Sequence, residues 1–148
     1  MQAAMRRTVD DLLAAARTRL RRLEPEEAAR AQAAGHPLVD IRGAEQVAAQ
    51  GEIPDALWIP RNVLEWRVDA ASGHQHPALA GREDDVVLIC AQGYQSSLAA
   101  ATLHELGYTG VTDVVGGFAA WRAAGLPVRA SATPPNGRPA RGSRPAPS

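Results

Sequence analysis

The 148-residue sequence contains no lysine, only one cysteine and no long apolar run. A lone cysteine has no partner within the chain, which excludes an internal disulfide framework and a zinc site with several cysteine ligands. A single thiol also fits a reducing compartment. No apolar segment approaches the roughly 18 residues of a membrane span, and the first residues turn acidic where a signal peptide would be apolar. We therefore expect a cytoplasmic protein without a membrane partner.

Every basic side chain is arginine, and the 16 basic residues are balanced by 16 acidic ones. The balance is uneven, because Arg138, Arg141 and Arg144 lie in a last stretch that holds no acid. The rest of the chain is therefore mildly acidic. A nucleic-acid-binding domain would carry a basic patch, so we expect no nucleic-acid partner.

Three regions follow from the composition. Residues 130–148 form a stretch rich in proline and arginine with almost nothing to bury, and they are predicted to be disordered. Residues 25–129 have the length of one domain. Residues 1–24 are predicted to be a helical extension, capped by Thr8, that packs on the domain or pairs with another copy. A single apolar stripe supports this helix: Val9, Leu12, Leu13, Ala16 and Leu20.

Short apolar runs alternate with helix-like runs across the predicted domain. The short runs are PLVDI, ALWIP, DVVLIC and VTDVV, and DVVLIC has the pattern of a strand buried on both faces. Alternation of this kind indicates an α/β domain with a mostly parallel sheet. Helices are predicted at 25–35, 44–51, 62–68 with Asn62 as the cap, 96–107 and 118–125.

The single cysteine, Cys90, stands at the carboxyl end of the most apolar strand, where parallel sheets bind ligands. The loop AQGYQ follows it, and we expect its N–H groups and those of the next helix to converge on the sulfur and to favour the thiolate. Gly93 permits a positive φ. The hydroxyl of Ser96 or Ser97 either caps the helix or turns toward the sulfur. The alternative is that Cys90 is only a small buried hydrophobe.

Four segments between about Glu26 and Val128 resemble the rhodanese-like family of single-domain sulfurtransferases. They are LVDIR, GEIPDALWIP, CAQGYQSS and GGFAAWRAAGLPV, in the family's order. In the second segment Glu52 stands where histidine is common, and Asp55 stands where glycine is common. The resemblance implies a three-layer α/β domain with a mostly parallel, five-stranded sheet flanked by helices.

The resemblance also implies chemistry through a persulfide on Cys90. A small sulfur-donor anion such as thiosulfate would supply the sulfur, and a thiol or a protein would accept it, with no cofactor and no metal. Asp40 and Arg42 are expected to support the structure rather than take part in the reaction. The residues expected to contact the substrate are Arg61 and the loop positions Ala91, Gln92, Gly93, Tyr94, Gln95 and Ser96.

The chain departs from the family at two loop positions, because many members have arginine where this sequence has Ala91 and Gln95. We interpret this as a change of donor rather than a loss of activity. Related dual-specificity phosphatases have a longer loop and an arginine six positions after the cysteine, where this chain has Ser96, so a phosphatase is not expected. Two alternatives stay open: a non-catalytic binding or regulatory module, and a redox sensor that uses Cys90 alone.

Overall fold

The computed structural model describes residues 6–132. The predicted disordered tail begins at residue 130, so all but its start lies outside the described residues. The regular elements are α1 (Val9–Arg17), α2 (Pro25–Ala33), β1 (Leu38–Asp40), α3 (Ala44–Gln50), β2 (Leu57–Trp58), α4 (Leu64–Val68), β3 (Val87–Ile89), α5 (Gln95–Glu105), β4 (Thr112–Asp113) and α6 (Gly117–Ala123). Short 3₁₀ turns lie at Arg61–Val63, Pro77–Leu79 and Glu83–Asp85. This order confirms the predicted alternation of strands and helices.

One parallel sheet runs through the middle of the molecule, with its strands in the order β2-β1-β3-β4. The four strands are fewer than the five that the resemblance implied. Beyond β4, where a fifth would pair, Leu23 makes only a single parallel bridge to Val114. The chain cannot continue along this edge, because Pro25 has no N–H to give to a ladder and begins α2.

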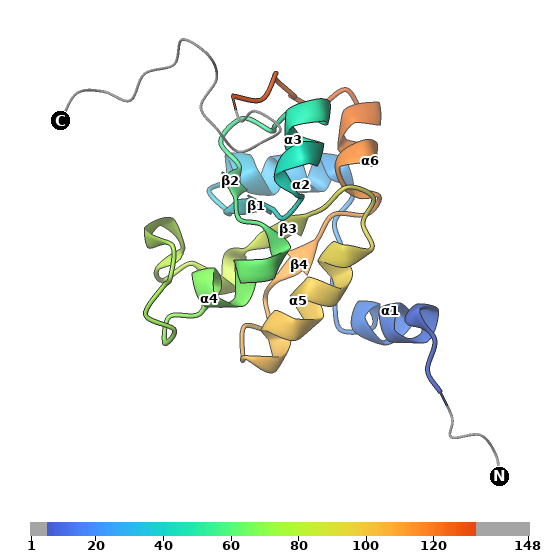
Figure 1. Cartoon of the computed structure of the whole chain (residues 1–148), viewed down its shortest axis with the longest axis vertical. Coiled ribbons are helices and arrows are strands. Elements are labelled where there is room, and N and C mark those ends of the chain that lie inside the picture. Colours follow the sequence, from blue (N-terminus) through green and yellow to red (C-terminus); the bar gives the residue numbers. More distant parts are fainter. Residues whose placement is uncertain (1–5, 133–148) are drawn as a thin grey trace.

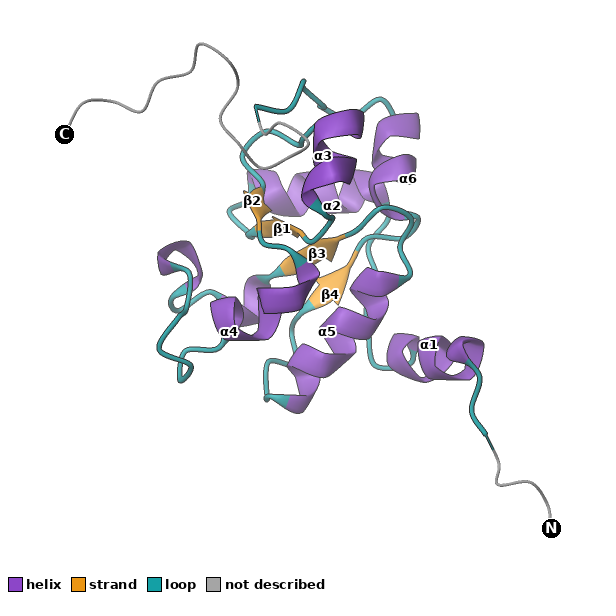
Figure 2. Cartoon of the chain, viewed as in Figure 1, coloured by secondary structure: helices purple, strands orange, loops and turns teal. Residues whose placement is uncertain are grey.

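Helices cover both faces of the sheet, as Figure 2 shows, which confirms the three-layer fold. Side chains of β3 alternate between two cores: Leu88 faces one and Ile89 the other. The first core includes residues of α4 and α5, such as Leu103, and the second includes residues of α2 and α6, such as Trp121. All of these side chains are almost fully buried. A strand covered on both faces needs the continuous apolar pattern that DVVLIC has.

The first helix lies beside α5, away from the sheet (Figure 1). Thr8 and Asp11 form a capping box that fixes its first turn, so the predicted cap is confirmed. The predicted apolar stripe is only partly buried: Ala16 is enclosed, whereas Val9 and Leu12 are exposed. The structure shows this extension packed on its own domain through α5.

Two predicted helix starts differ from the structure. Asn62 does not cap a helix, because residues 61–63 form a 3₁₀ turn after Pro60 and α4 begins at Leu64. The helix after the cysteine loop begins at Gln95, one residue earlier than predicted, and no side chain caps it. The earlier start of α5 matters for the site. Ser96 and Ser97 lie inside the helix and do not cap it, so their hydroxyls are available for partners outside the helix.

Candidate active site

The only cysteine lies at the floor of a pocket. Cys90 is the first residue after β3, and its residue surface is 5% exposed. The pocket has a volume of about 840 Å³ and opens at the carboxyl ends of the strands. The described residues that line it are Ile41, Arg42, Gly43, Gln46, Gln50, Pro60, Arg61, Asn62, Cys90, Ala91, Gln92, Tyr94, Gln95, Phe118, Ala119 and Arg122.

Two backbone amides converge on the sulfur. The N–H of Gly93 lies 3.1 Å from Cys90 Sγ, and the N–H of Ser96, in the first turn of α5, lies 3.3 Å from it. Gly93 has a φ of 84°, a backbone conformation that residues with a Cβ atom rarely adopt. A Cβ atom at this position would lie 2.7 Å from the backbone nitrogen of Gly116. Glycine is therefore required both for the turn and for the close approach of α6.

The first turn of α6 fixes the other side of the loop. The N–H of Phe118 donates to the carbonyl of Cys90 at 2.7 Å, and the N–H of Ala119 donates to the carbonyl of Ala91 at 3.0 Å. A Cβ atom on Gly117 would lie 2.5 Å from the Cys90 carbonyl, so this glycine permits the contact. Because these carbonyls are held outward by α6, the loop is free to turn N–H groups toward the sulfur.

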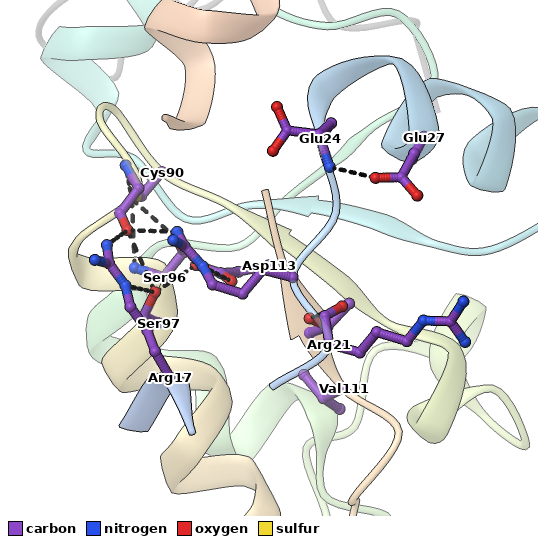
Figure 3. A network of polar contacts seen from close by, with 12 residues as sticks. Arg17, Arg21, Glu24, Glu27, Cys90, Ser96, Ser97, Val111 and Asp113 are labelled. Atoms are coloured by element: carbon purple, nitrogen blue, oxygen red, sulfur yellow. Dashed lines mark hydrogen bonds and ion pairs between the residues drawn. The ribbon is translucent and has the colours of Figure 1, made fainter. Parts of the chain in front are cut away.

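The hydroxyl of Ser96 completes the surroundings of the sulfur (Figure 3). Its Oγ lies 3.2 Å from Cys90 Sγ and 2.8 Å from Asp113 Oδ2. A carboxylate only accepts, so the hydroxyl proton points to Asp113 and the oxygen accepts from the thiol. In a thiolate, the same hydroxyl can rotate and donate to the sulfur. Of the two expectations for this serine, the structure shows the inward one.

Asp113 anchors this cluster from β4 and is fully buried. Its Oδ2 also accepts from the Ser97 hydroxyl at 2.7 Å, and the Arg22 guanidinium binds both carboxylate oxygens, at 2.8 and 3.2 Å. A buried charge needs such partners. The sequence reasoning missed Asp113, although one signal was present: an acidic residue in the middle of an apolar strand.

The pocket carries positive charge at its rim. Arg61 lines it and donates through Nη1 to both oxygens of Glu65 at 2.8 Å, while its Nε is buried without a partner among the described residues. Arg122, on α6, also lines the pocket and donates to the Gln50 carbonyl. No acidic residue is among the described residues that line the pocket. Arg122 was missed from the sequence, because its position near the loop depends on how α6 packs.

Asp40 and Arg42 form a buried pair at the pocket wall, and Arg42 is itself one of the lining residues. The Arg42 side chain is fully buried, and its Nη2 lies 2.7 Å from Asp40 Oδ2. The same guanidinium donates to the Gly51 carbonyl and lies over the Phe118 ring, 3.8 Å from its centroid. All of these partners are protein groups, so the pair ties β1, α3 and α6 together.

The loop residues named from the sequence fall into two groups. Ala91, Gln92, Tyr94 and Gln95 line the pocket, with Tyr94 58% exposed at its mouth. Gly93 and Ser96 instead direct their backbone N–H groups to the sulfur. Within residues 6–132, no three His, Cys, Asp or Glu side chains are placed to hold a metal ion. No helix in that range is long and apolar enough to cross a membrane.

Comparison with known proteins identifies the fold. The family model of the rhodanese-like domain matches residues 24–124, more than half of the chain. The chain belongs to the rhodanese-like family. The expected resemblance is thereby confirmed, and residues 6–23, which include α1, lie outside the part that the family model matches.

Curated relatives of this rhodanese-like chain include sulfurtransferases. A sulfurtransferase of Allochromatium vinosum is 38% identical over 91 residues, which cover 62% of this chain and 76% of the relative. The thiosulfate sulfurtransferase GlpE of Pseudomonas savastanoi pv. phaseolicola is 34% identical over 106 residues, 72% of this chain and 91% of the relative.

A solved structure covers more of the chain than the family model does. It is a protein of unknown function from Rhodopseudomonas palustris, described as a possible tyrosine phosphatase, with a TM-score of 0.76 and 30% identity. The match covers 87% of this chain and 99% of that one. Fold likeness alone does not decide between sulfur and phosphoryl transfer, which depends on the site.

Two of the departures from the family pattern, at Glu52 and Asp55, have local explanations in the structure. Asp55 stands where glycine is common in the family, and it has a φ of 66°, a left-handed conformation that aspartate tolerates. Glu52 stands where histidine is common, and it pairs with Arg129 through an antiparallel bridge and a 2.8 Å ion pair. Neither Glu52 nor Asp55 is among the described residues that line the pocket.

Proposed function

We propose that this rhodanese-like chain is a sulfurtransferase or sulfur carrier that holds a sulfane sulfur on Cys90. The Cys90 thiolate attacks the outer sulfur of a donor such as thiosulfate, the donor's S–S bond breaks, and sulfite leaves with the bonding pair. This gives a persulfide on Cys90. An acceptor nucleophile, a small thiol or a protein thiol, then attacks the outer sulfur and the Cys90 thiolate departs. Splitting one transfer into two steps is covalent catalysis.

The observation that carries the proposal is the pair of amides at the sulfur. The N–H groups of Gly93 and Ser96 point at Cys90 Sγ and cost no reorganisation during the reaction, because α5 and α6 already fix the loop. They stabilise negative charge on the sulfur before attack and on the leaving thiolate afterwards. A cysteine that only filled the core would not gather these donors at the floor of an open pocket.

The rim arginines support an anionic donor. Arg61 and Arg122 line the pocket above Cys90, and they supply positive charge that Ala91 and Gln95 do not. Because Glu65 offsets the charge of Arg61, we expect weaker attraction for a doubly charged donor than two loop arginines would give. We therefore expect thiosulfate to bind weakly and a less highly charged sulfane donor to bind comparatively better.

The remaining residues shape the pocket. Gln92 and Tyr94 stand at the entrance, where an acceptor must approach. Asp40 and Arg42 support the wall, and we expect neither to take part in the reaction, because the Arg42 guanidinium is already bonded to Asp40 and to the Gly51 carbonyl. We expect the protein to act in a reducing compartment such as the cytoplasm, where its single thiol stays free between turnovers.

Phosphoryl transfer is disfavoured by the same geometry. A cysteine phosphatase needs a guanidinium at the position six residues after the cysteine to bind phosphate, and here that residue is Ser96. Its side chain is fully buried and bonded to Asp113. Arg42 cannot replace it, because its guanidinium is committed to Asp40 and Gly51.

Steady-state assays test the proposal. With thiosulfate and cyanide the protein should release sulfite and form thiocyanate, whereas Cys90→Ser should do neither. With para-nitrophenyl phosphate both proteins should be inactive. The assay is repeated with a panel of sulfane donors, including polysulfide, so that inactivity with one donor is not mistaken for a lack of sulfurtransferase activity. Absence of transfer from every donor would contradict the proposal and favour a binding module.

A further inference from the structure

The segment that precedes the family-matched domain reaches the back of the cysteine loop with two arginines. Arg17, the last residue of α1, donates from Nη2 to the Gly93 carbonyl at 2.7 Å and from Nε to Ser97 Oγ at 3.1 Å. Arg22 donates to the same carbonyl at 3.0 Å while it binds Asp113. Both residues lie outside the region that the rhodanese-like family model matches.

These contacts hold the residue that touches the sulfur. Gly93 donates its N–H to Cys90 Sγ, and its carbonyl accepts from both guanidinium groups. Hydrogen bonds therefore hold both backbone groups of this glycine. Hydrogen bonds from a charged donor are the strong ones. Through Asp113, Arg22 also holds the carboxylate that orients the Ser96 hydroxyl beside the sulfur.

The fold fixes the position of both arginines. Residues 21–23, which include Arg22, run along the free edge of β4. The Thr112 hydroxyl donates to the Arg21 carbonyl, and the Leu23 N–H donates to the Asp113 carbonyl. At the other end, α1 packs against α5, the helix that carries Ser96 (Figure 1). The guanidinium groups are thus placed by packing at both ends of their segment.

We propose that Arg17 and Arg22 are positioning residues, which hold the Gly93 and Ser96 amides against Cys90 Sγ from behind the loop. The consequence for sulfur transfer rests on the proposed function. Neither arginine is among the described residues that line the pocket, so neither contacts the donor. Their loss therefore lowers the limiting rate of persulfide formation and leaves the donor concentration at half-maximal rate unchanged.

The test uses three variants of the full chain. Arg17→Gln removes both hydrogen bonds of a half-buried side chain without leaving an acid unpaired. It also removes the guanidinium that lies 5.6 Å from the centroid of the Tyr94 ring, a contact that Arg22→Lys leaves in place, so an effect shared by both variants does not come from Tyr94. Arg22→Lys keeps a positive charge beside Asp113 and so guards against misfolding, but an ammonium lacks the planar fork that reaches both Asp113 and Gly93. Arg19→Gln is the matched control, because Arg19 is exposed and its side chain makes no hydrogen bond to the loop within the described residues.

The first readout does not depend on sulfur transfer. Amide hydrogen exchange of Gly93 and Ser96, followed by NMR in the reduced protein, should accelerate about tenfold in Arg17→Gln and Arg22→Lys, and not in Arg19→Gln. The second readout is the rate of persulfide formation over a range of donor concentrations. The limiting rate should fall about tenfold in the same two variants, with the half-saturating concentration within twofold of wild type.

Three results would overturn the inference. One is exchange of Gly93 and Ser96 that matches the Arg19→Gln control. Another is faster exchange with an unaltered limiting rate. A third is a change confined to the half-saturating donor concentration, which would make the arginines part of donor binding. If the wild-type protein took no sulfur from any donor, the proposed function would be wrong. The amide exchange of Gly93 and Ser96 would still test whether the two arginines position the loop.

Discussion

Substituting Gly93 by alanine should disable the sulfur site, and the structure gives the size of the effect. The added Cβ would meet the Gly116 nitrogen at 2.7 Å and its Cα at 3.2 Å, both backbone atoms that cannot rotate away. A left-handed conformation costs an alanine about 1–2 kcal/mol. Crowding in a packed region adds about 1–3 kcal/mol. We expect the free energy of unfolding to fall by about 2–5 kcal/mol if the loop stays in place.

The loop can relieve this strain only by moving away from α6, and the Gly93 N–H then leaves the sulfur. A hydrogen bond to a charged group contributes about 1.5–3 kcal/mol, which corresponds to roughly 10- to 150-fold in rate. Persulfide formation, followed by rapid-quench mass spectrometry at saturating donor, should slow by that factor. Urea unfolding measured on the same samples separates the change in stability from the change in rate.

Gly73→Ala provides the matched control. Gly73 has nearly the same conformation, with a φ of 82°, but a Cβ there would meet nothing within 4 Å. It should show the conformational cost alone, about 1–2 kcal/mol, and load sulfur at the wild-type rate. The reasoning would be refuted if Gly93→Ala loaded as fast as wild type, or if both variants lost the same activity.

Three further substitutions test separate parts of the site. Replacing Arg42 by methionine leaves the Asp40 charge buried and should lower the free energy of unfolding in urea by about 3–5 kcal/mol. Arg82→Met is the control, because Arg82 pairs with Asp85 at the surface, and it should lower the free energy of unfolding by at most about 1 kcal/mol. Equal losses in the two variants would contradict the account. Gln95→Arg adds charge to the pocket and should lower the Michaelis constant for thiosulfate about fivefold, for about 1 kcal/mol of attraction; an unchanged constant would mean that the donor binds elsewhere. Glu65→Gln removes the acid that pairs with Arg61 and should lower the Michaelis constant for thiosulfate. A higher Michaelis constant would instead show that the ion pair is needed to form the donor site.

Much of the fold was predictable because its signals are local. A β-branched run ending in Cys90, a glycine three residues on and a helix after it predicted a strand, a tight loop and a site at the sheet edge. The shortened fifth strand was not predicted. The cause was nonetheless visible, since Pro25 follows Leu23 so closely that the chain must leave the sheet edge at once.

The support behind the loop could not be predicted from local pattern. Arg17 is 76 residues from Gly93 in sequence, and Arg22 is 91 residues from Asp113. Neither arginine differs locally from its neighbours in a segment rich in arginine. The inward turn of Ser96 also involves a distant partner, because its hydroxyl donates to Asp113, 17 residues away in sequence. Such roles depend on tertiary contacts, which a period or a motif does not encode.

The central claim is that Cys90 accepts a second sulfur atom, and intact-mass spectrometry after treatment with a sulfane donor tests it most directly. The account predicts that the wild-type protein gains the mass of one sulfur, that cyanide removes it, and that fragmentation places it on the peptide that contains Cys90. Cys90→Ser should gain nothing under the same conditions. A wild-type mass that stays unchanged with every donor, or an equal gain in Cys90→Ser, would contradict the account.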